Sequence, residues 1–288
     1  MKQVMKIAAA GAFALGAMTT GAFAAATAQP GETAGLAAGA PLPEGLYFVN
    51  TFSWGVIDNP GPDTKLLVDI PLIAWSTPWQ LFGGNIQVLA ATPLIHADGP
   101  FGADAYGFYN PFLAGRIAFD LGGGLGVSYL SGIYFNIGDN DVSVRATTWR
   151  QDFAVSYTND GWNLTANLIW GNTFDTDRAV GGKTSNGFNL DLTATKTFGK
   201  WEIGAIGFGS TEYDLPDAQK RSNGGPGKVE TFAVGPLIGY NFGPVILQAA
   251  LTTSIYSKNS GDDTRFWSRI VIPLWSPEKP MAPLVTKY

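Results

Sequence analysis

The side chains suited to catalysis in this sequence are few, and a single histidine leads them. His96 stands close to Asp98 and Asp104, and a histidine beside a carboxylate is the pair that activates a serine nucleophile in acyl transfer. No Gly-x-Ser-x-Gly turn accompanies it. We therefore expect His96 to be a polar loop residue and the protein not to be an enzyme. An outer-membrane lipid or ester hydrolase stays as an alternative.

Two loops carry the oxygen ligands that calcium prefers, Asp139-Asn140-Asp141 and Asp175-Thr176-Asp177. Neither has the glycine and the distal glutamate of an EF-hand loop, so we expect solvated acids, with no metal and no cofactor. The absence of cysteine excludes disulfides, thiolate catalysis and zinc–thiolate sites. A formal net charge of −5 argues against a nucleic-acid partner, which needs a basic surface.

The N-terminus predicts export from the cytoplasm. Lys2 and Lys6 precede an apolar stretch that runs from Ile7 to Met18, and Ala22-Phe23-Ala24 is an A-x-A cleavage site. This pattern is typical of a secretory signal peptide, here residues 1–24. Residues 25–44 are rich in Ala, Gly and Pro without a repeating period, which predicts a mobile leader.

From Leu46 onward, segments of about ten residues alternate apolar and polar side chains, as strands with two different faces do. Long polar connections, such as Asn172 to Asn186, alternate with tight ones, such as Asn159 to Gly161. Charged residues are only 14% of the chain, against about 25% in soluble domains. These features predict an all-β fold, a transmembrane antiparallel up-and-down β-barrel of about 12 strands over residues 45–275, in the bacterial outer membrane. A tail occupies residues 276–288. A soluble β-sandwich would carry more Lys and Glu on its outer faces.

The polar faces of the predicted strands should line the lumen. Charged side chains assigned to the lumen are candidates for a constriction, and they are Asp69, Arg116, Arg150, Asp152, Asp191, Glu202, Arg265 and Arg269. Residues of opposite charge either pair with one another and hold the strand register, or form a constriction that selects solutes by size and electrostatic field. The sequence leaves both roles open.

Aromatic and proline residues suggest two further features. Four aromatic residues are candidates for an apolar vestibule: Phe101, Tyr106, Phe108 and Tyr109. A place in the aromatic belt at the membrane–water interface would explain them equally well. Prolines delete ladder hydrogen bonds within strands, so Pro71, Pro93 and Pro236 predict bulges. A bulge at Pro93 or Pro236 would give a lateral window from the lumen to the membrane.

Three segments carry a resemblance to a known family: Leu42-Pro43-Glu44-Gly45-Leu46-Tyr47, Tyr109-Asn110-Pro111-Phe112, and the run from Arg265 to Trp275. They resemble the meta-pathway phenol degradation family of secreted Gram-negative proteins, often called transporters. The resemblance implies an outer-membrane channel for aromatic or other hydrophobic compounds, with outer-membrane lipids, small hydrophobic solutes and the barrel-assembly machinery as partners. Outer-membrane barrels usually end at an aromatic residue of the last strand, whereas here Trp275 is followed by Ser276 to Tyr288. The signal for insertion into the outer membrane is therefore either internal or in this tail.

The function expected from these features is passive uptake of small hydrophobic or aromatic compounds. The alternatives are the hydrolase and a structural or adhesive barrel without transport. The sequence names neither the solute nor the oligomeric state, and it leaves open whether residues 25–44 plug the lumen.

Overall fold

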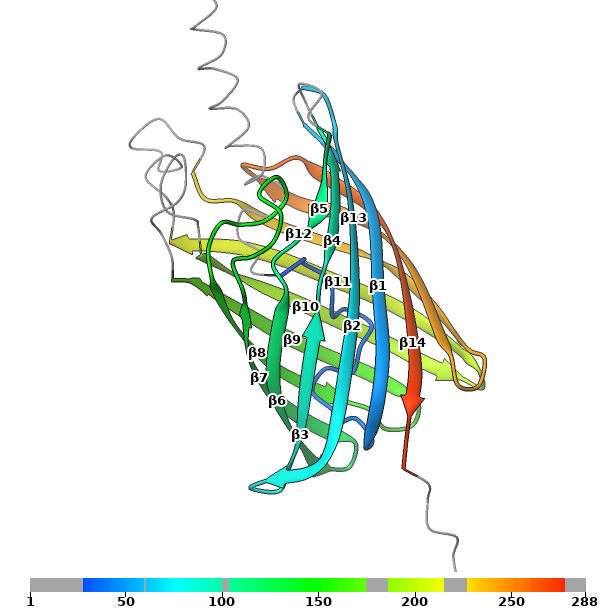
Figure 1. Ribbon diagram of the computed structural model, residues 1–288. Helices are drawn as coiled ribbons and strands as arrows, with labels where there is room; N and C mark the ends of the chain where they lie inside the picture. The colour runs from blue at the N-terminus through cyan, green and yellow to red at the C-terminus, as the bar shows by residue number, and fades with distance from the viewer. Residues whose placement is uncertain (1–27, 60, 100–103, 175–185, 215–226, 278–288) are drawn as a thin grey trace, which may run out of the picture.

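The protein is a closed barrel of antiparallel strands with the leader segment inside it (Figure 1). The computed structural model describes residues 28–59, 61–99, 104–174, 186–214 and 227–277. Its strands are β1 (Gly45–Asp58), β2 (Thr64–Leu81), β3 (Gly84–Ala91), β4 (Leu94–Asp98), β5 (Asp104–Phe108), β6 (Phe112–Gly122), β7 (Leu125–Tyr134), β8 (Thr148–Tyr157), β9 (Trp162–Thr173), β10 (Asn186–Phe198), β11 (Trp201–Asp214), β12 (Glu230–Asn241), β13 (Ile246–Lys258) and β14 (Asp262–Trp275).

Fourteen segments make twelve strands of the barrel wall because two of those strands are interrupted. β3 and β4 both pair with β2, while β6 pairs with β3 and β5 pairs with β4. β3 and β4 are therefore two parts of one strand, and β5 and β6 are two parts of the next. β1 pairs with both β2 and β14, which closes the barrel. The prediction of a closed antiparallel barrel of about 12 strands is confirmed.

Tight turns close one end of the barrel. The turn from β6 to β7 passes through Gly122, Gly123 and Gly124, whose φ angles are 84°, 62° and 85°. Glycine adopts this left-handed region without the steric cost that a side chain adds. Longer connections lie at the other end, and residues 100–103, 175–185 and 215–226 of these connections lie outside the described residues.

Several expectations fall on residues that the structure does not describe. The signal peptide, Phe101, the Asp175–Asp177 loop and most of the tail are among them. Among the described residues, no helix is long and apolar enough to cross a membrane.

The two faces of the wall differ in β9 and β10 as the alternation predicts. Leu164 and Leu168 are exposed on the outer surface, whereas Thr165 and Asn167, which alternate with them, are buried toward the lumen. In a membrane, the outer set contacts lipid.

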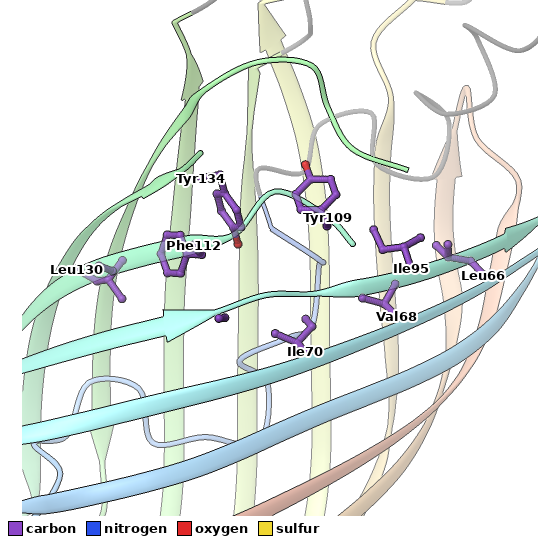
Figure 2. Packing of buried hydrophobic residues seen from close by; sticks show 10 residues of the cluster. Leu66, Val68, Ile70, Ile95, Tyr109, Phe112, Leu130 and Tyr134 are labelled. Atoms are coloured by element: carbon purple, nitrogen blue, oxygen red, sulfur yellow. The ribbon is translucent and has the colours of Figure 1, made fainter. Parts of the chain in front are cut away.

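The inner surface has a second, apolar character over β2 to β7. Figure 2 shows a cluster of inward-facing side chains there, which we call the apolar wall. Its buried members are Leu66, Val68, Ile70, Ala91, Ile95, Tyr109, Phe112, Ala114, Leu130 and Tyr134. The strands from β8 to β14 instead bury charged and amide side chains, such as Asp152, Asn167 and Arg269. β11 to β14 also bury a second apolar cluster, which includes Ile206, Phe208, Leu237 and Trp267 and packs against Ala34 of the leader. We call the β2–β7 side the apolar half and the β8–β14 side, which holds most of the charged groups, the polar half.

Candidate functional site

The leader runs through the lumen. Consecutive turns shape it, with the Ala34 amide donating to the Gly31 carbonyl at 3.1 Å and the Leu36 amide to the Thr33 carbonyl at 3.0 Å. Ala34 is only 2% exposed. The structure thus differs from the expected mobile leader, because residues 28–42 are held against the barrel wall at many points.

Glycines let the leader approach the wall closely. A Cβ atom on Gly39 would lie 2.4 Å from the Ser156 nitrogen, and one on Gly31 would lie 2.7 Å from the Phe208 ring. Gly31 and Gly35 also have φ angles of 90° and 93°, where other residues are strained. These glycines recur at every fourth position, so the prediction that the leader has no repeating period is wrong.

Asp191 on β10 is a main anchor of the leader on the polar half. Its carboxylate accepts hydrogen bonds from the Gly31 amide at 2.8 Å, the Thr33 amide at 2.9 Å and the Thr33 hydroxyl at 2.6 Å. Asn167 on β9 also donates to the Thr33 hydroxyl, at 3.1 Å. Charge-assisted bonds of this kind are stronger than neutral ones.

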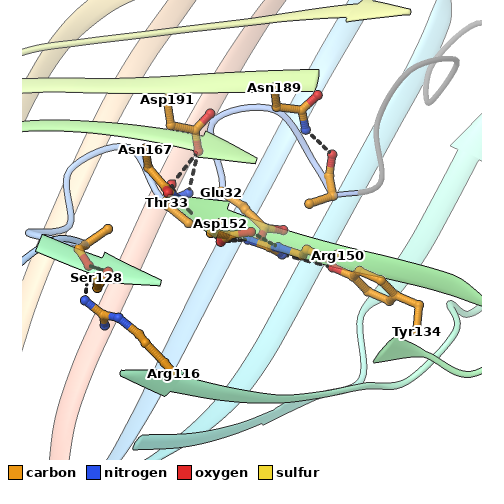
Figure 3. Close-up of polar contacts among 12 residues, drawn as sticks. Glu32, Thr33, Arg116, Ser128, Tyr134, Arg150, Asp152, Asn167, Asn189 and Asp191 are labelled. Carbon is orange, nitrogen blue, oxygen red and sulfur yellow. Dashed lines mark hydrogen bonds and ion pairs between the residues drawn. The ribbon is translucent and has the colours of Figure 1, made fainter. Parts of the chain in front are cut away.

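Arg150 on β8 joins the leader to the wall through two carboxylates (Figure 3). Its Nε and Nη2 donate to the two oxygens of Asp152, at 2.8 and 2.7 Å, in a bidentate pair. Its Nη1 contacts Glu32 of the leader and the Tyr134 hydroxyl. Burial raises the pKa of the Glu32 carboxyl above its ordinary value, and Arg150 opposes this shift by favouring the charged form.

Two other arginines bind carbonyl oxygens of the leader. Arg269 on β14 donates to Ala34 O at 2.6 Å and Glu32 O at 2.7 Å. Arg116 on β6 contacts Ala38 O and donates to Ala40 O at 3.1 Å. The leader therefore has polar anchors on both sides of the lumen.

A cavity of about 250 Å³ lies between the leader and the apolar wall. Leader residues from Glu32 to Leu42 form one side, and Ile70, Leu72, Leu89 and Leu130 contribute to the other. An engineered apolar cavity of about 150 Å³ is large enough to bind benzene. This cavity therefore has room for one substituted aromatic ring or an aliphatic molecule of similar size.

Seven of the eight charged residues predicted for the lumen do face it. Arg116, Arg150, Asp152, Asp191 and Arg269 take part in the contacts described above. Glu202 accepts from Thr195 and Gln248, at 2.5 and 2.8 Å. Arg265 donates to Asp263 at 2.9 Å and to Ser53 at 3.2 Å.

Asp69 is the exception, because it faces outward. On β2 its neighbours Val68 and Ile70 belong to the apolar wall, so Asp69 lies on the opposite face, where the Asn50 amide donates to it at 2.7 Å. β2 has apolar residues on both faces, so the rule that the polar side chain faces the lumen fails there.

The predicted vestibule residues are divided between two faces of the wall. Tyr106 and Phe108 are 66% and 52% exposed, whereas Tyr109 is buried in the apolar wall. His96 Nε2 lies 2.6 Å from Asp104 Oδ1, and its ring meets Tyr106 edge-on. Among the described residues, no serine hydroxyl is hydrogen-bonded to His96.

The Asp139 loop shows a structural use for its acid. Asp139 Oδ2 accepts a 2.7 Å hydrogen bond from the Phe108 amide. Within the described parts of the chain, no group of three or more His, Asp or Glu side chains is arranged to hold a metal ion.

Pro93 lies at the interruption between β3 and β4. The register of β2 with this strand is the same on both sides of it, as the pairs Leu72–Ala91 and Asp69–Leu94 show. On the other edge, the Tyr109 amide donates to the Pro93 carbonyl at 2.7 Å. The register changes instead in the facing strand, between β5 and β6.

Pro71 and Pro236 each lie at a gap in the strand pairing on one side, because Ile70 and Pro71 have no partner on β3 or β4 and Gly235 and Pro236 have none on β13. Pro71 pairs with Asn50, and Pro236 pairs with Ala205. Beside Pro236, a Cβ atom on Gly235 would lie 1.9 Å from the carbonyl oxygen of β13 that it faces. β12 and β13 therefore lie close together at Gly235 although their pairing is interrupted there, and the lateral window at Pro93 or Pro236 stays a prediction.

Comparisons with known proteins agree with this architecture. The crystal structure of the COG4313 outer membrane channel from Pseudomonas putida F1 is similar with a TM-score of 0.69 and 12% identity, over 81% of this chain and 97% of that one. At this identity the likeness shows the fold alone.

Two autotransporter domains are more distant. The translocator domain of NalP from Neisseria meningitidis has a TM-score of 0.43 and 11% identity, over 80% of this chain and 89% of that one. The beta domain of Bordetella Brka has a TM-score of 0.43 and 14% identity, over 79% and 99%. TM-scores this low carry no argument. A search of curated proteins found no match.

The family comparison is more specific. A model described as "Putative MetA-pathway of phenol degradation" matches residues 27–270, which include the leader and nearly the whole barrel. This chain therefore belongs to that family.

Proposed function

We propose that the protein is an outer-membrane channel for passive uptake of small hydrophobic or aromatic compounds. The observation that carries this proposal is the apolar wall, which lines one half of the lumen and faces a cavity of about 250 Å³. Apolar surface in a lumen is unfavourable unless it is covered. A hydrophobic solute covers it, whereas a sugar would lose hydrogen bonds to water there.

The division of the lumen supports the same proposal. The polar half holds the leader through Asp191, Arg150 and Arg269, so these side chains are already hydrogen-bonded. The apolar wall lines much of the remaining space, which Arg150, Asp152 and Asn167 also border. In this account the lumen charges position the leader, and the leader narrows the barrel to a passage that suits apolar solutes.

The family and the fold comparison agree with a channel. The family description refers to phenol degradation, and a solved structure with the same fold is an outer membrane channel. Neither identifies the solute that this chain passes, and we draw the hydrophobic class from the apolar wall.

The proposal is tested by solute entry into vesicles whose outer leaflet contains lipopolysaccharide, which slows hydrophobic solutes. We expect purified protein to raise the entry rate of phenol and toluene above that of protein-free vesicles, with little effect on glucose. Equal acceleration of glucose would make the barrel a general pore. No acceleration of any solute would favour a structural or adhesive barrel.

A further inference from the structure

Of the lumen arginines, Arg116 and Arg269 hydrogen-bond only to uncharged acceptors among the described residues, and Arg116 is the one of these two that lines the cavity. Arg150 contacts Asp152 and Glu32, and Arg265 contacts Asp263. Among the described residues, Arg116 has no carboxylate within ion-pair distance. Its hydrogen bonds go to uncharged acceptors, which are Gln87 Oε1 at 3.1 Å and the leader carbonyls of Ala38 and Ala40.

Arg116 also lines the cavity beside the apolar wall. Leu130 is its direct cross-strand partner on β7, and Leu72 and Leu89 line the same space. The nearest acid of the polar half, Asp152, already has both oxygens bound by Arg150. A partly buried guanidinium with neutral partners retains most of its attraction for an anion.

The cavity therefore combines the Arg116 guanidinium, which has no ion-pair partner among the described residues, with an enclosure that is mainly apolar. Arg150, Asp152 and Glu32 also border the cavity, and they pair with one another. Nη2 of Arg116 bonds two leader carbonyls and Nη1 bonds Gln87, so a carboxylate would accept charge-assisted hydrogen bonds from the N–H groups of Nε and Nη1 that bond no described residue. An aromatic ring attached to that carboxylate would bury its surface against the leucines.

We infer that this cavity binds a small carboxylate with an apolar body, such as an aromatic monocarboxylate, and that Arg116 is its counterion. This inference rests on the proposed function in that the cavity belongs to the passage. It adds a substrate class, the amphipathic monoanion, that neutral hydrophobic uptake does not include.

The test is calorimetric binding to the full mature protein in lipid nanodiscs, with empty nanodiscs subtracted. Benzoate is compared with benzyl alcohol, which has the same ring and no charge. We expect benzoate to bind on the order of tenfold more tightly, the range that a hydrogen bond to a charged group provides. Arg116→Gln should bring the two affinities close together.

Two further variants serve as matched controls. Lys196→Gln removes a cation that lies over the Trp162 and Phe198 rings, outside the cavity, and should leave the benzoate preference unchanged. Leu89→Trp fills the cavity and should weaken binding of both ligands. Arg116→Lys keeps the charge and should keep a preference for benzoate, so it replaces Arg116→Gln if that variant fails to fold.

Equal affinity of the wild-type protein for benzoate and benzyl alcohol would overturn the inference. A benzoate preference that survives in Arg116→Gln would also overturn it. These outcomes are separate from those of the vesicle assay. Phenol entry without a benzoate preference would support the channel and contradict the anion site. A benzoate preference without entry of any solute would support the anion site and contradict the channel.

Discussion

Asp191→Ala should release the leader from the polar half of the barrel. The carboxylate of Asp191 accepts three hydrogen bonds from Gly31 and Thr33 at 2.6 to 2.9 Å. Each hydrogen bond to a charged group contributes about 1.5 to 3 kcal/mol, and these contributions are not additive. Because water can reach some of the released donors, we take about 3 kcal/mol for the set, which corresponds to roughly a hundredfold change in the ratio of docked to undocked leader.

Thiol labelling measures this change directly, because the chain has no cysteine of its own. Ala34→Cys places one thiol at a leader position that is only 2% exposed. In this background, Asp191→Ala should raise the labelling rate by up to a hundredfold and should admit sugars to vesicles. Asp98→Asn is the matched control, because among the described residues the ion-pair partner of this acid is Lys65, in a surface ion pair of little energetic value.

The account of the leader would be refuted if Asp191→Ala left both the labelling rate and sugar entry at their wild-type values. Faster labelling without sugar entry would show that the leader moves and that something else closes the lumen to polar solutes.

Three other perturbations act on the contacts of the lumen and the wall. Gly39→Val adds a side chain where a Cβ would already lie 2.4 Å from backbone, so sugar entry should rise, whereas Gly61→Val, with open space around it, should leave sugar entry unchanged. Asn50→Leu leaves outward-facing Asp69 without its amide donor and should lower the free energy of unfolding in urea by about 1 to 3 kcal/mol; the double variant with Asp69→Leu should recover most of this loss, and no recovery would contradict the pairing. Leu130→Asn should slow phenol entry several-fold while glucose entry stays low, since the solute loses about 1 kcal/mol of apolar contact, and an unchanged phenol rate would argue against contact with this wall.

Alternation of side chains is sufficient to predict the barrel and most of its inward-facing charges. In β9 and β10 one face is plainly polar, so the assignment of Asp191 to the lumen rests on periodicity alone. In β2 both faces are apolar around Asp69, and only pairing with β1 decides which face lies inside. The error at Asp69 is therefore one of register, which single-strand patterns do not contain.

The path of the leader is beyond the reach of strand periodicity. Composition rich in Ala and Gly predicts mobility, but the contacts that fix residues 28–42 come from side chains more than a hundred residues away, such as Ser156 and Asp191. The spacing of Gly31, Gly35 and Gly39 is the available signal. This spacing can be interpreted only once the barrel wall against which the leader packs is known.

The apolar wall escapes prediction for a related reason. Leu130 on β7 and Phe112 on β6 look like lipid-facing residues in sequence, because an apolar side chain in a barrel strand is assigned to the outer surface by default. They form a continuous inner surface only through pairing of neighbouring strands.

The central claim, that hydrophobic solutes pass between the leader and the apolar wall, is tested most directly by filling that space. Phenol entry into lipopolysaccharide-containing vesicles is compared for the wild-type protein, for Leu89→Trp inside the cavity, and for Leu190→Trp on the outer face. The account predicts that Leu89→Trp lowers phenol entry to the rate of protein-free vesicles, while Leu190→Trp retains the wild-type rate. Phenol entry that is unchanged in a correctly folded Leu89→Trp barrel would contradict it.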